Sequence, residues 1–365
     1  MATRKTIFIA CPWTPPVGGG MLKVADYLIQ SQRAEAAVQL RPLDTRGGGG
    51  KLGSVVVLLG AMARLLLARL TGRVAGVHVN MGPRLSLVRK SLLLAFARAL
   101  GLPVVLHLHS QARTLYEPSP ALVRAWIRWT FARATRVVVI GQAARDFVTG
   151  ELKVRPERVD VVVNGVPAPQ HPRAPLSASG SRVRLLFLGN LGEAKGVSDL
   201  LQALALSQQA AQGRIDAVFV GGGDIAAYQA KAEALGICGF THFPGWAEQS
   251  QTSQWLASAD MLVLPSHDEV LPLVILEALA HGVAVVCTPV GEIPHTLQDG
   301  RDALFVTPRD PAALAATLDR LVADAELRHT LERRGRELFH ERFSLEHFAD
   351  AVADVHQRAF GVRAR

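Results

Sequence analysis

Cysteine and aromatic residues are both scarce in this sequence of 365 residues. The three cysteines, Cys11, Cys238 and Cys287, have no paired spacing, so neither a disulfide framework nor a zinc site is indicated. A reducing, cytoplasmic setting fits this usage. Aromatic residues make up 6% of the chain, and the sequence shows no stacking platform and no recognition helix. Binding to nucleic acid is therefore not expected.

A long uninterrupted apolar run is also missing. The N-terminal apolar stretch is too short for a secretory signal and has no cleavage site. The best transmembrane candidate, Leu52 to Leu70, is interrupted by Arg64 and Arg69. Its clean part is about 12 residues long, whereas a membrane span needs about 20. We interpret this segment as a largely buried helix.

Acidic residues are sparse in one half of the chain. Residues 1–175 carry 24 Lys and Arg against 8 Asp and Glu, and residues 176–365 carry 16 against 23, within a net charge of +9. A basic half indicates an anionic partner, and with so few aromatic residues an anionic membrane surface fits better than nucleic acid. The length suits two domains, and 49% hydrophobic residues suffice for two cores.

The first half alternates predicted strands with predicted helices. Thr6 to Cys11 is expected to be a buried strand, and a Pro/Gly loop with Gly19 and Gly20 leads into a helix. Such glycines let a phosphate approach main-chain N–H groups, although many of these loops are simple turns. Residues 84–101 are predicted to form a basic helix. It is either a packed helix with a solvated basic face or an amphipathic surface held against anionic lipid.

Two histidines end the strand predicted in LPVVLHLHSQ. The alternation of a strand puts His107 and His109 on the same side. No third ligand with suitable spacing follows, so a metal site is not expected and one of the two histidines is interpreted as structural.

Residues 260–296 carry two carboxylates in a strand–loop–helix pattern. A strand, Met261 to Leu264, precedes a polar turn with Glu269, and Glu277 follows eight positions later. On one continuous helix these carboxylates would diverge by roughly 80°. With Glu269 in a loop and Glu277 in the next helix, both can line a cleft at the carboxyl end of a parallel sheet, where the N–H groups of residues 272–275 would meet an anion such as a diphosphate. The alternative is a pair of ordinary solvated carboxylates.

Two glycine-rich loops precede that region. One follows the strand Val183 to Leu188 and contains Lys195. The other, G-x-G-x-x-A from Gly221, has the form of a dinucleotide-binding fingerprint. We reject that function because no acidic residue ends the next strand, near Thr241. Residues 167–180, rich in Pro, Ala and Ser, are interpreted as an interdomain linker.

The order of these residues resembles a known family. The string PS-x-x-E-x-x-P-x-x-x-x-E-A-x-A-x-G, followed by V-G-x-I-P, is similar to the paired-glutamate signature of the retaining family-4 glycosyltransferases. The loop at Lys195 resembles their G-R-L-x-x-x-K-G loop, with Asn190 in place of Arg. The resemblance implies the α/β GT-B fold, with two Rossmann-like domains whose parallel sheets face each other across a cleft and a C-terminal helix that returns to the first domain. The domains would be residues 1–167 with 344–365, and residues 168–343.

The same resemblance implies the site residues. The catalytic residues would be Glu269, His109 and Lys195. The donor-binding residues would be Gly19, Gly20, Asn190, Trp246, Ala247, Leu273, Val274 and Glu277. The residues for the acceptor or its phosphate would be Ser86, Arg89, Lys90 and Tyr116.

The resemblance also implies an activity. The chain would move a hexose, with retention and without a metal or other cofactor, from a nucleotide-sugar donor to a glycan acceptor. The acceptor is expected to be linked to a lipid diphosphate, in cell-surface polysaccharide or glycolipid biosynthesis. The enzyme is expected in the cytoplasm, peripherally on the inner face of the cytoplasmic membrane. Two alternatives remain open: a nucleotide-sugar epimerase or hydrolase on the same fold, and a non-catalytic interaction module.

Overall fold

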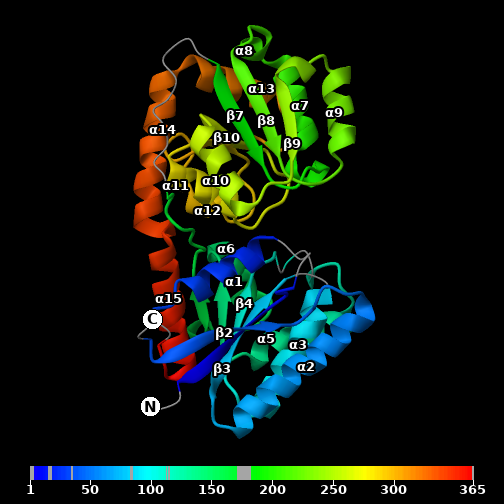
Figure 1. Ribbon diagram of the computed structural model, residues 1–365, viewed down its shortest axis with the longest axis vertical. Helices are drawn as coiled ribbons and strands as arrows, with labels where there is room; N and C mark the ends of the chain where they lie inside the picture. Colours follow the sequence, from blue (N-terminus) through cyan, green and yellow to red (C-terminus); the bar gives the residue numbers. More distant parts are fainter. Residues whose placement is uncertain are drawn as a thin grey trace. The chain divides into compact units, whose positions relative to one another are not determined.

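The computed structural model describes residues 4–14, 19–33, 36–82, 85–111, 113, 116–170 and 182–363. The chain divides into two compact units, which we call unit 1 (Met1–Gly165 and Leu345–Arg365) and unit 2 (Val166–Ser344). Each unit is a parallel sheet covered by helices (Figure 1). Most of the predicted linker, from residue 171 onward, lies outside the described residues, as does Arg84 of the predicted basic helix.

Unit 1 is built on a six-stranded sheet in the order β2-β1-β3-β4-β5-β6. Its strands are β1 (Lys5–Cys11), β2 (Val38–Asp44), β3 (Val74–Met81), β4 (Val104–Leu108), β5 (Arg136–Val139) and β6 (Val159–Val161). All five residues of β4 are buried, as expected for a parallel sheet covered on both faces. β2, which the sequence analysis missed, contains Pro42, and an edge strand tolerates proline because only one side of it needs ladder bonds.

Helices cover both faces of this sheet (Figure 1). One face carries α2 (Lys51–Leu70), α3 (Leu85–Ala99), α5 (Ala121–Arg133) and α6 (Gln142–Gly150), whose apolar side chains join one core. The other face carries α1 (Gly20–Gln30) and the C-terminal helix α15 (Leu345–Phe360). α15 approaches β3 so closely that a Cβ on Gly76 would lie 2.4 Å from the Phe360 ring. The C-terminal helix therefore belongs to the first unit, as the resemblance implied.

The expectation that residues 52–70 form a largely buried helix is wrong. The helix forms, but its fully buried side chains, among those described, are Ser54, Leu58, Ala61 and Leu65. By length and composition alone, Leu52–Leu70 is the one described helix that could cross a membrane, and 22% of it is buried in the protein. The expectation failed because a helix that is apolar on all sides does not reveal which side its neighbours cover.

Unit 2 repeats the architecture, with the strand order β12-β11-β10-β7-β8-β9. Its strands are β7 (Val183–Leu188), β8 (Ile215–Val220), β9 (Thr241–Gly245), β10 (Met261–Leu264), β11 (Ala284–Cys287) and β12 (Leu304–Phe305). Its helices are α7 (Val197–Leu206), α8 (Gln208–Ala211), α9 (Ile225–Ala234), α10 (Gln249–Ser258), α11 (Leu273–His281), α12 (Ile293–Thr296), α13 (Pro311–Ala323) and α14 (Ala325–Leu338). β7 and β10 have the bounds that the sequence predicted.

Each sheet has a point at which the strand order reverses. In unit 1 it lies between β1 and β3, and in unit 2 between β7 and β10. Open α/β sheets bind their ligands outside the carboxyl ends of the strands at such a point. The loops that follow these four strands are therefore where a site is expected.

Candidate functional site

The loops after β7, β8 and β9 are tied together in unit 2. The main-chain N–H of Gly189 donates to the carbonyl of Val220 (3.0 Å), and that of Gly221 donates to Gly245 (2.9 Å). A Cβ on Gly221 would lie 1.7 Å from the Gly189 carbonyl oxygen, so only glycine fits there. Close packing between the loops therefore explains why glycine occurs in the segment that resembles a dinucleotide fingerprint.

The loop that carries Lys195 rests on the loop after β10. Lys195 ends a short 3₁₀ turn, Glu193–Lys195, and Gly196 follows with φ of 69°. A Cβ on Gly196 would lie 2.0 Å from the carbonyl oxygen of Pro265. The main-chain N–H of His267 donates to the carbonyl of Ala194 (2.9 Å), which fixes the register of the two loops.

The contact between these two loops brings together two of the predicted catalytic residues. The ammonium group of Lys195 forms an ion pair with Oε1 of Glu269, although 74 residues separate them in the sequence. The Ser266 hydroxyl donates to the same carboxylate oxygen at 3.0 Å. The side chain of Lys195 is 33% exposed and that of Glu269 is 11% exposed. The pair thus lies at the unit 2 switch point with the lysine open to solvent, where an anion can reach it.

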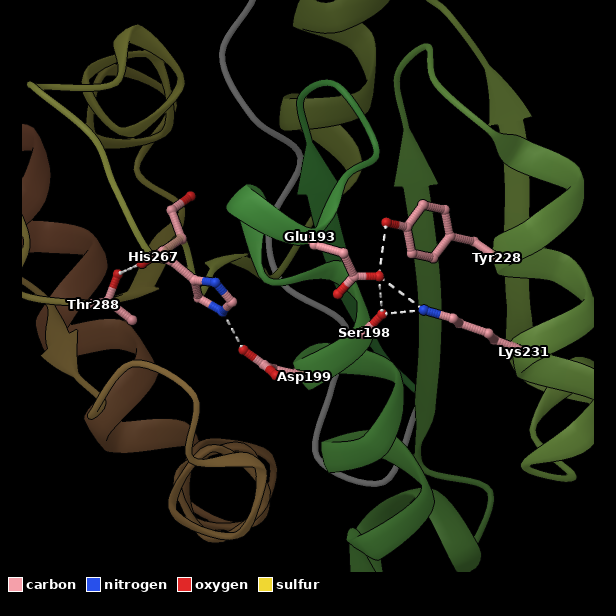
Figure 2. Close-up of polar contacts among 8 residues, drawn as sticks. Glu193, Ser198, Asp199, Tyr228, Lys231, His267 and Thr288 are labelled. Atoms are coloured by element: carbon pink, nitrogen blue, oxygen red, sulfur yellow. Dashed lines mark hydrogen bonds and ion pairs between the residues drawn. The ribbon is translucent and has the colours of Figure 1, made fainter. Parts of the chain in front are cut away.

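A polar pair that the sequence analysis missed anchors the loop bearing Glu269. Nε2 of His267 lies 2.6 Å from Oδ2 of Asp199, which links that loop to α7 (Figure 2). On the other side of the loop, the hydroxyl of Thr288 donates to the carbonyl of Ser266 (2.5 Å). The polar turn after β10 was noticed in the sequence, but its partner on α7 had no local signal.

A second polar cluster lies beside the Lys195 loop (Figure 2). Glu193 accepts from the ammonium of Lys231 (2.8 Å), from the hydroxyl of Ser198 (2.6 Å) and from the hydroxyl of Tyr228 (3.3 Å). These contacts lower the pKa of Glu193, led by the bonds from Lys231 and Ser198. The Lys231–Glu193 pair is more exposed than the Lys195–Glu269 pair, so it contributes less to local stability.

Helix α11 brings Glu277 near the same edge of the sheet. The helix begins at Leu273 after Pro272, which has no N–H, and the N–H of Ile275 already donates to Pro272 at 3.2 Å. Of residues 272–275, Leu273 and Val274 are therefore the ones whose N–H groups suit an anion. Glu277 lies half-buried in the second turn of the helix.

The glycine of the V-G-x-I-P segment holds the loop before α11 in place. Gly291 has φ of 61°, and a Cβ on it would lie 2.0 Å from the carbonyl oxygen of Glu269. The N–H of Glu292 donates to the carbonyl of Val270 (2.8 Å). The glycine is therefore required by close packing against the residue that forms the ion pair.

Three further predicted donor-binding residues lie at the strand ends of unit 2. Asn190 is exposed, and its Oδ1 lies 3.5 Å from where a Cβ on Gly222 would stand. Trp246 flanks the same glycine, with Cδ1 at 4.0 Å from that position, and is 72% exposed. Ala247 follows it, half-buried. An exposed indole beside an unhindered glycine suits contact with a planar ring, which stays a prediction.

In unit 1, His109 lies directly after β4. Its Nε2 is 2.8 Å from Oδ1 of Asn80, and its main-chain N–H donates to Met81 (2.9 Å). Burial lowers the pKa of His109 to about 3, and His78 and Lys90 add to the effect. His109 is therefore a neutral imidazole held in one orientation, able to form a hydrogen bond without carrying charge.

Lys90 is not on the exposed surface that we expected. It is completely buried, and its ammonium donates to the carbonyls of Asn80 and, at 3.4 Å, Ala10. Burial lowers its pKa to about 8. Because Asn80 and Ala10 lie near the ends of β3 and β1, the ammonium of Lys90 lies at the unit 1 switch point. The exposed placement is wrong, and its predicted contact with an acceptor phosphate stays a prediction.

The remaining predicted residues of unit 1 are divided between surface and core. Gly19 and Gly20 are exposed at the start of α1, where Gly19 has φ of 112°. Ser86 accepts from the N–H of Gly82 (3.3 Å), and Arg89 is partly buried, which lowers its pKa. Tyr116 is buried in the core, and its hydroxyl accepts from Arg128 (3.1 Å).

A buried histidine chain runs from α15 to β4. His356 Nε2 lies 2.8 Å from His78 Nδ1, and His78 Nε2 lies 3.2 Å from His107 Nδ1. Burial lowers the pKa of all three, that of His78 to about 3. His107 is therefore the structural member of the predicted pair, and its ring centroid is 4.0 Å from that of His109. Among the described residues, no group of three or more His, Cys, Asp or Glu side chains is arranged to hold a metal ion.

Comparison with known proteins shows the family to which this chain belongs. Residues 9–165 match the profile "Glycosyl transferase 4-like domain", and residues 172–338 match "Glycosyl transferases group 1". The D-inositol 3-phosphate glycosyltransferase of Frankia alni is 31% identical over 65% of this chain and 64% of its own length. The lipopolysaccharide core biosynthesis glycosyltransferase LpsE of Rhizobium meliloti is 33% identical over 50% of this chain and 52% of its own length. The chain thus spans between half and two thirds of these relatives.

Solved structures of similar shape cover nearly the whole chain. Anabaena Alr3699/HepE, crystallised in complex with UDP, has a TM-score of 0.75 at 17% identity and covers 96% of this chain and 98% of its own. WaaG, a glycosyltransferase involved in lipopolysaccharide biosynthesis, has a TM-score of 0.67 at 17% identity and covers 96% and 99%. At these identities the likeness shows the fold. The chain belongs to the group 1 glycosyltransferases of family 4 and has the GT-B fold that its sequence indicated.

Proposed function

We propose that this chain is a retaining, metal-independent hexosyltransferase with a nucleotide-sugar donor held by unit 2. The observation that carries the proposal is the Lys195–Glu269 pair at the unit 2 switch point, which is stabilised by Ser266. The fold relative HepE was crystallised with UDP and with UDP-glucose, which supports the donor class. The relative LpsE, named for lipopolysaccharide core biosynthesis, supports a lipid-linked glycan acceptor in cell-surface polysaccharide or glycolipid biosynthesis.

The proposed roles in donor binding follow from charge. Lys195 and the N–H groups of Leu273 and Val274 would hold the diphosphate and stabilise the negative charge that grows as it leaves. Glu269 would accept from sugar hydroxyls once the diphosphate draws Lys195 away from it. Glu277 would bind the ribose, because one carboxylate accepts two hydrogen bonds from a diol.

The proposed reaction needs no protein nucleophile. The acceptor oxygen attacks the anomeric carbon on the face from which the phosphate leaves, so the new glycosidic bond forms as the bond to the phosphate oxygen breaks. The acceptor proton passes to that leaving phosphate oxygen. His109, neutral and oriented by Asn80, would contact the donor sugar. We place the enzyme in the cytoplasm, peripherally on the inner face of the membrane that holds a lipid-linked acceptor.

Nucleotide binding is the first test of this proposal. Thermal-shift measurements with UDP, GDP and ADP, followed by their sugars, identify the donor. With that donor, Lys195→Ala is expected to lower kcat/KM for sugar transfer by about 10²–10³-fold, because a charge aimed at the leaving group is lost. Lys231→Ala is the matched control, since it removes a lysine from the exposed Glu193 pair, and it should change kcat/KM less than about twofold.

Three outcomes would contradict the proposal in different ways. Full transfer by Lys195→Ala, with donor binding unchanged, would remove the site assignment. Release of free sugar or of an epimer without an acceptor would favour the epimerase or hydrolase alternative. The absence of any nucleotide-dependent stabilisation would favour an interaction module.

A further inference from the structure

Helix α2 carries an exposed apolar stripe. We define the α2 stripe as its seven large hydrophobic side chains that are 40% to 85% exposed: Leu52, Val55, Val56, Leu59, Leu66, Leu67 and Leu70. At 100° per residue these positions fall within an arc of about 120°. The four buried residues of the helix fall on the opposite side, so the stripe runs along the whole outer face of α2.

Exposed apolar side chains are concentrated on α2 and are not spread evenly over the part of the protein that the structure describes. Among the described residues, fourteen large hydrophobic side chains are exposed, and half of them belong to α2. The same helical layer also exposes Leu92 on α3 and both Leu122 and Trp129 on α5. Single exposed apolar residues are ordinary, but a contiguous row of this length marks an interaction surface.

The charges around the stripe favour one kind of partner. Between Asp44 and Asp146 the sequence contains fifteen Lys and Arg and a single acid, Glu117. Unit 1 as a whole has 26 Lys and Arg against 11 Asp and Glu, a formal charge of +15. A second copy of unit 1 would bring the same positive charge to the interface and be repelled. An anionic membrane surface, in which an apolar layer lies beneath negatively charged headgroups, fits both the apolar stripe and the basic residues around it.

The two arginines of α2 leave the stripe apolar. Nε of Arg69 donates to the carbonyl of Leu100 (3.1 Å). The guanidinium of Arg64 lies 5.8 Å from the centre of the Phe8 ring. Both charged groups are therefore held by neighbouring parts of unit 1, at the margin of the exposed face, where they can meet lipid headgroups.

We propose that α2 lies in the plane of an anionic membrane surface, with the α2 stripe inserted below the headgroups. This proposal rests on the peripheral location proposed above and names the element responsible. A helix of 20 residues is about 30 Å long, enough to span a bilayer. The opposite side of α2 nevertheless packs on β2, β3 and α3, so crossing the membrane would empty the core of unit 1. The helix lies along the surface instead.

Vesicle flotation without any donor or acceptor tests the proposal. The double variant Leu59→Glu/Leu67→Glu is compared with Leu206→Glu/Leu235→Glu, which adds the same charge at exposed leucines of unit 2. The protein is expected to bind vesicles containing phosphatidylglycerol. Part of that binding should persist in about 0.5 M salt, where the Debye length falls to roughly 4 Å, because the inserted contact is apolar and is not screened. The α2 variant should bind at least about tenfold more weakly, and the unit 2 variant should bind like the parent protein.

A second measurement locates the contact. A polarity-sensitive dye on Leu67→Cys, in a Cys238→Ser background, should shift to the blue with anionic vesicles, whereas the same dye on the exposed native Cys238 should not. Equal flotation of the α2 variant and the parent would overturn the proposal. So would a parent that binds no vesicles but forms a dimer that the α2 variant loses. Thermal shifts with nucleotides are read separately, so a failure of vesicle binding is distinguished from a failure of donor binding.

Discussion

Each unit places a lysine at the switch point of its sheet, and the two lysines have opposite surroundings. Lys90 in unit 1 is completely buried and donates to main-chain carbonyls near the ends of β1 and β3. Lys195 in unit 2 is partly exposed and pairs with the carboxylate of Glu269. The ammonium of Lys90 is held by fixed main-chain carbonyls, whereas that of Lys195 is held by a side chain whose place a ligand can take. The same topology thus holds a buried lysine bound to the backbone in unit 1 and a partly exposed lysine paired with a carboxylate in unit 2.

The first prediction compares two glycines: one follows Lys195 and packs against the loop after β10, and the other has open space around it. Gly196 and Gly72 have nearly the same φ, 69° and 65°, but a Cβ on Gly196 would meet the Pro265 carbonyl at 2.0 Å and one on Gly72 meets nothing within 4 Å. Gly72→Ala should destabilise the protein by about 1 kcal/mol, the strain of the left-handed conformation alone. Gly196→Ala should cost about 2–4 kcal/mol, because the loop must also move.

Thermal unfolding of both variants checks this prediction, and donor binding sharpens it. Gly196→Ala should weaken nucleotide binding, because it displaces Lys195, while Gly72→Ala should leave it unchanged. Equal destabilisation by the two substitutions would mean that the loop after β10 yields easily and does not fix the position of Lys195.

The second prediction concerns pH and unit 1. His78 has a pKa of about 3 in the folded protein because of its burial, against about 6.5 in the unfolded chain. The unfolded state therefore binds more protons in this range, and stability falls as the pH drops below about 6.5. At pH 5 the loss is about 2 kcal/mol for this one histidine. Calorimetry at pH 7 and pH 5 should show it.

A variant of the histidine chain serves as the control. His78→Phe removes the titrating group, so the free energy of unfolding should depend less on pH between 5 and 7, whatever its value at pH 7. If the parent and His78→Phe lose the same stability between these pH values, the histidine chain does not govern the acid sensitivity of unit 1.

The sequence predicted unit 2 better than unit 1, for a physical reason. In unit 2 the sequence signals are local. They are the glycines of tightly packed loops, a helix that begins after Pro272, and two buried strands with clear ends. The resemblance then allowed Lys195 and Glu269 to be assigned to one site. The His267–Asp199 bond could not be anticipated, because it joins residues 68 positions apart with no periodic pattern.

Unit 1 resisted prediction where burial depends on distant segments. His356 on α15 and His78 on β3 are 278 positions apart, and neither has a local feature that marks it as a partner of the other. The basic appearance of residues 84–101 suggested an exposed surface, yet Lys90 faces inward. The apolar appearance of α2 suggested burial, yet most of its large side chains face outward. Composition identified these helices correctly but not the side that each one exposes.

The last prediction concerns a substitution that adds a positive charge to the loop that carries Lys195. Asn190 occupies the position where the family resemblance expects Arg, and it is exposed beside Gly222, so a longer side chain has room. Asn190→Arg should tighten binding of the nucleoside diphosphate about tenfold, since a charge-assisted bond contributes about 1.5–3 kcal/mol, part of which is lost to side-chain ordering. Calorimetric titration of both proteins measures it, with Asn190→Gln as the uncharged control of similar reach. If the Arg variant binds the diphosphate no tighter than the Gln variant, the diphosphate does not lie beside residue 190.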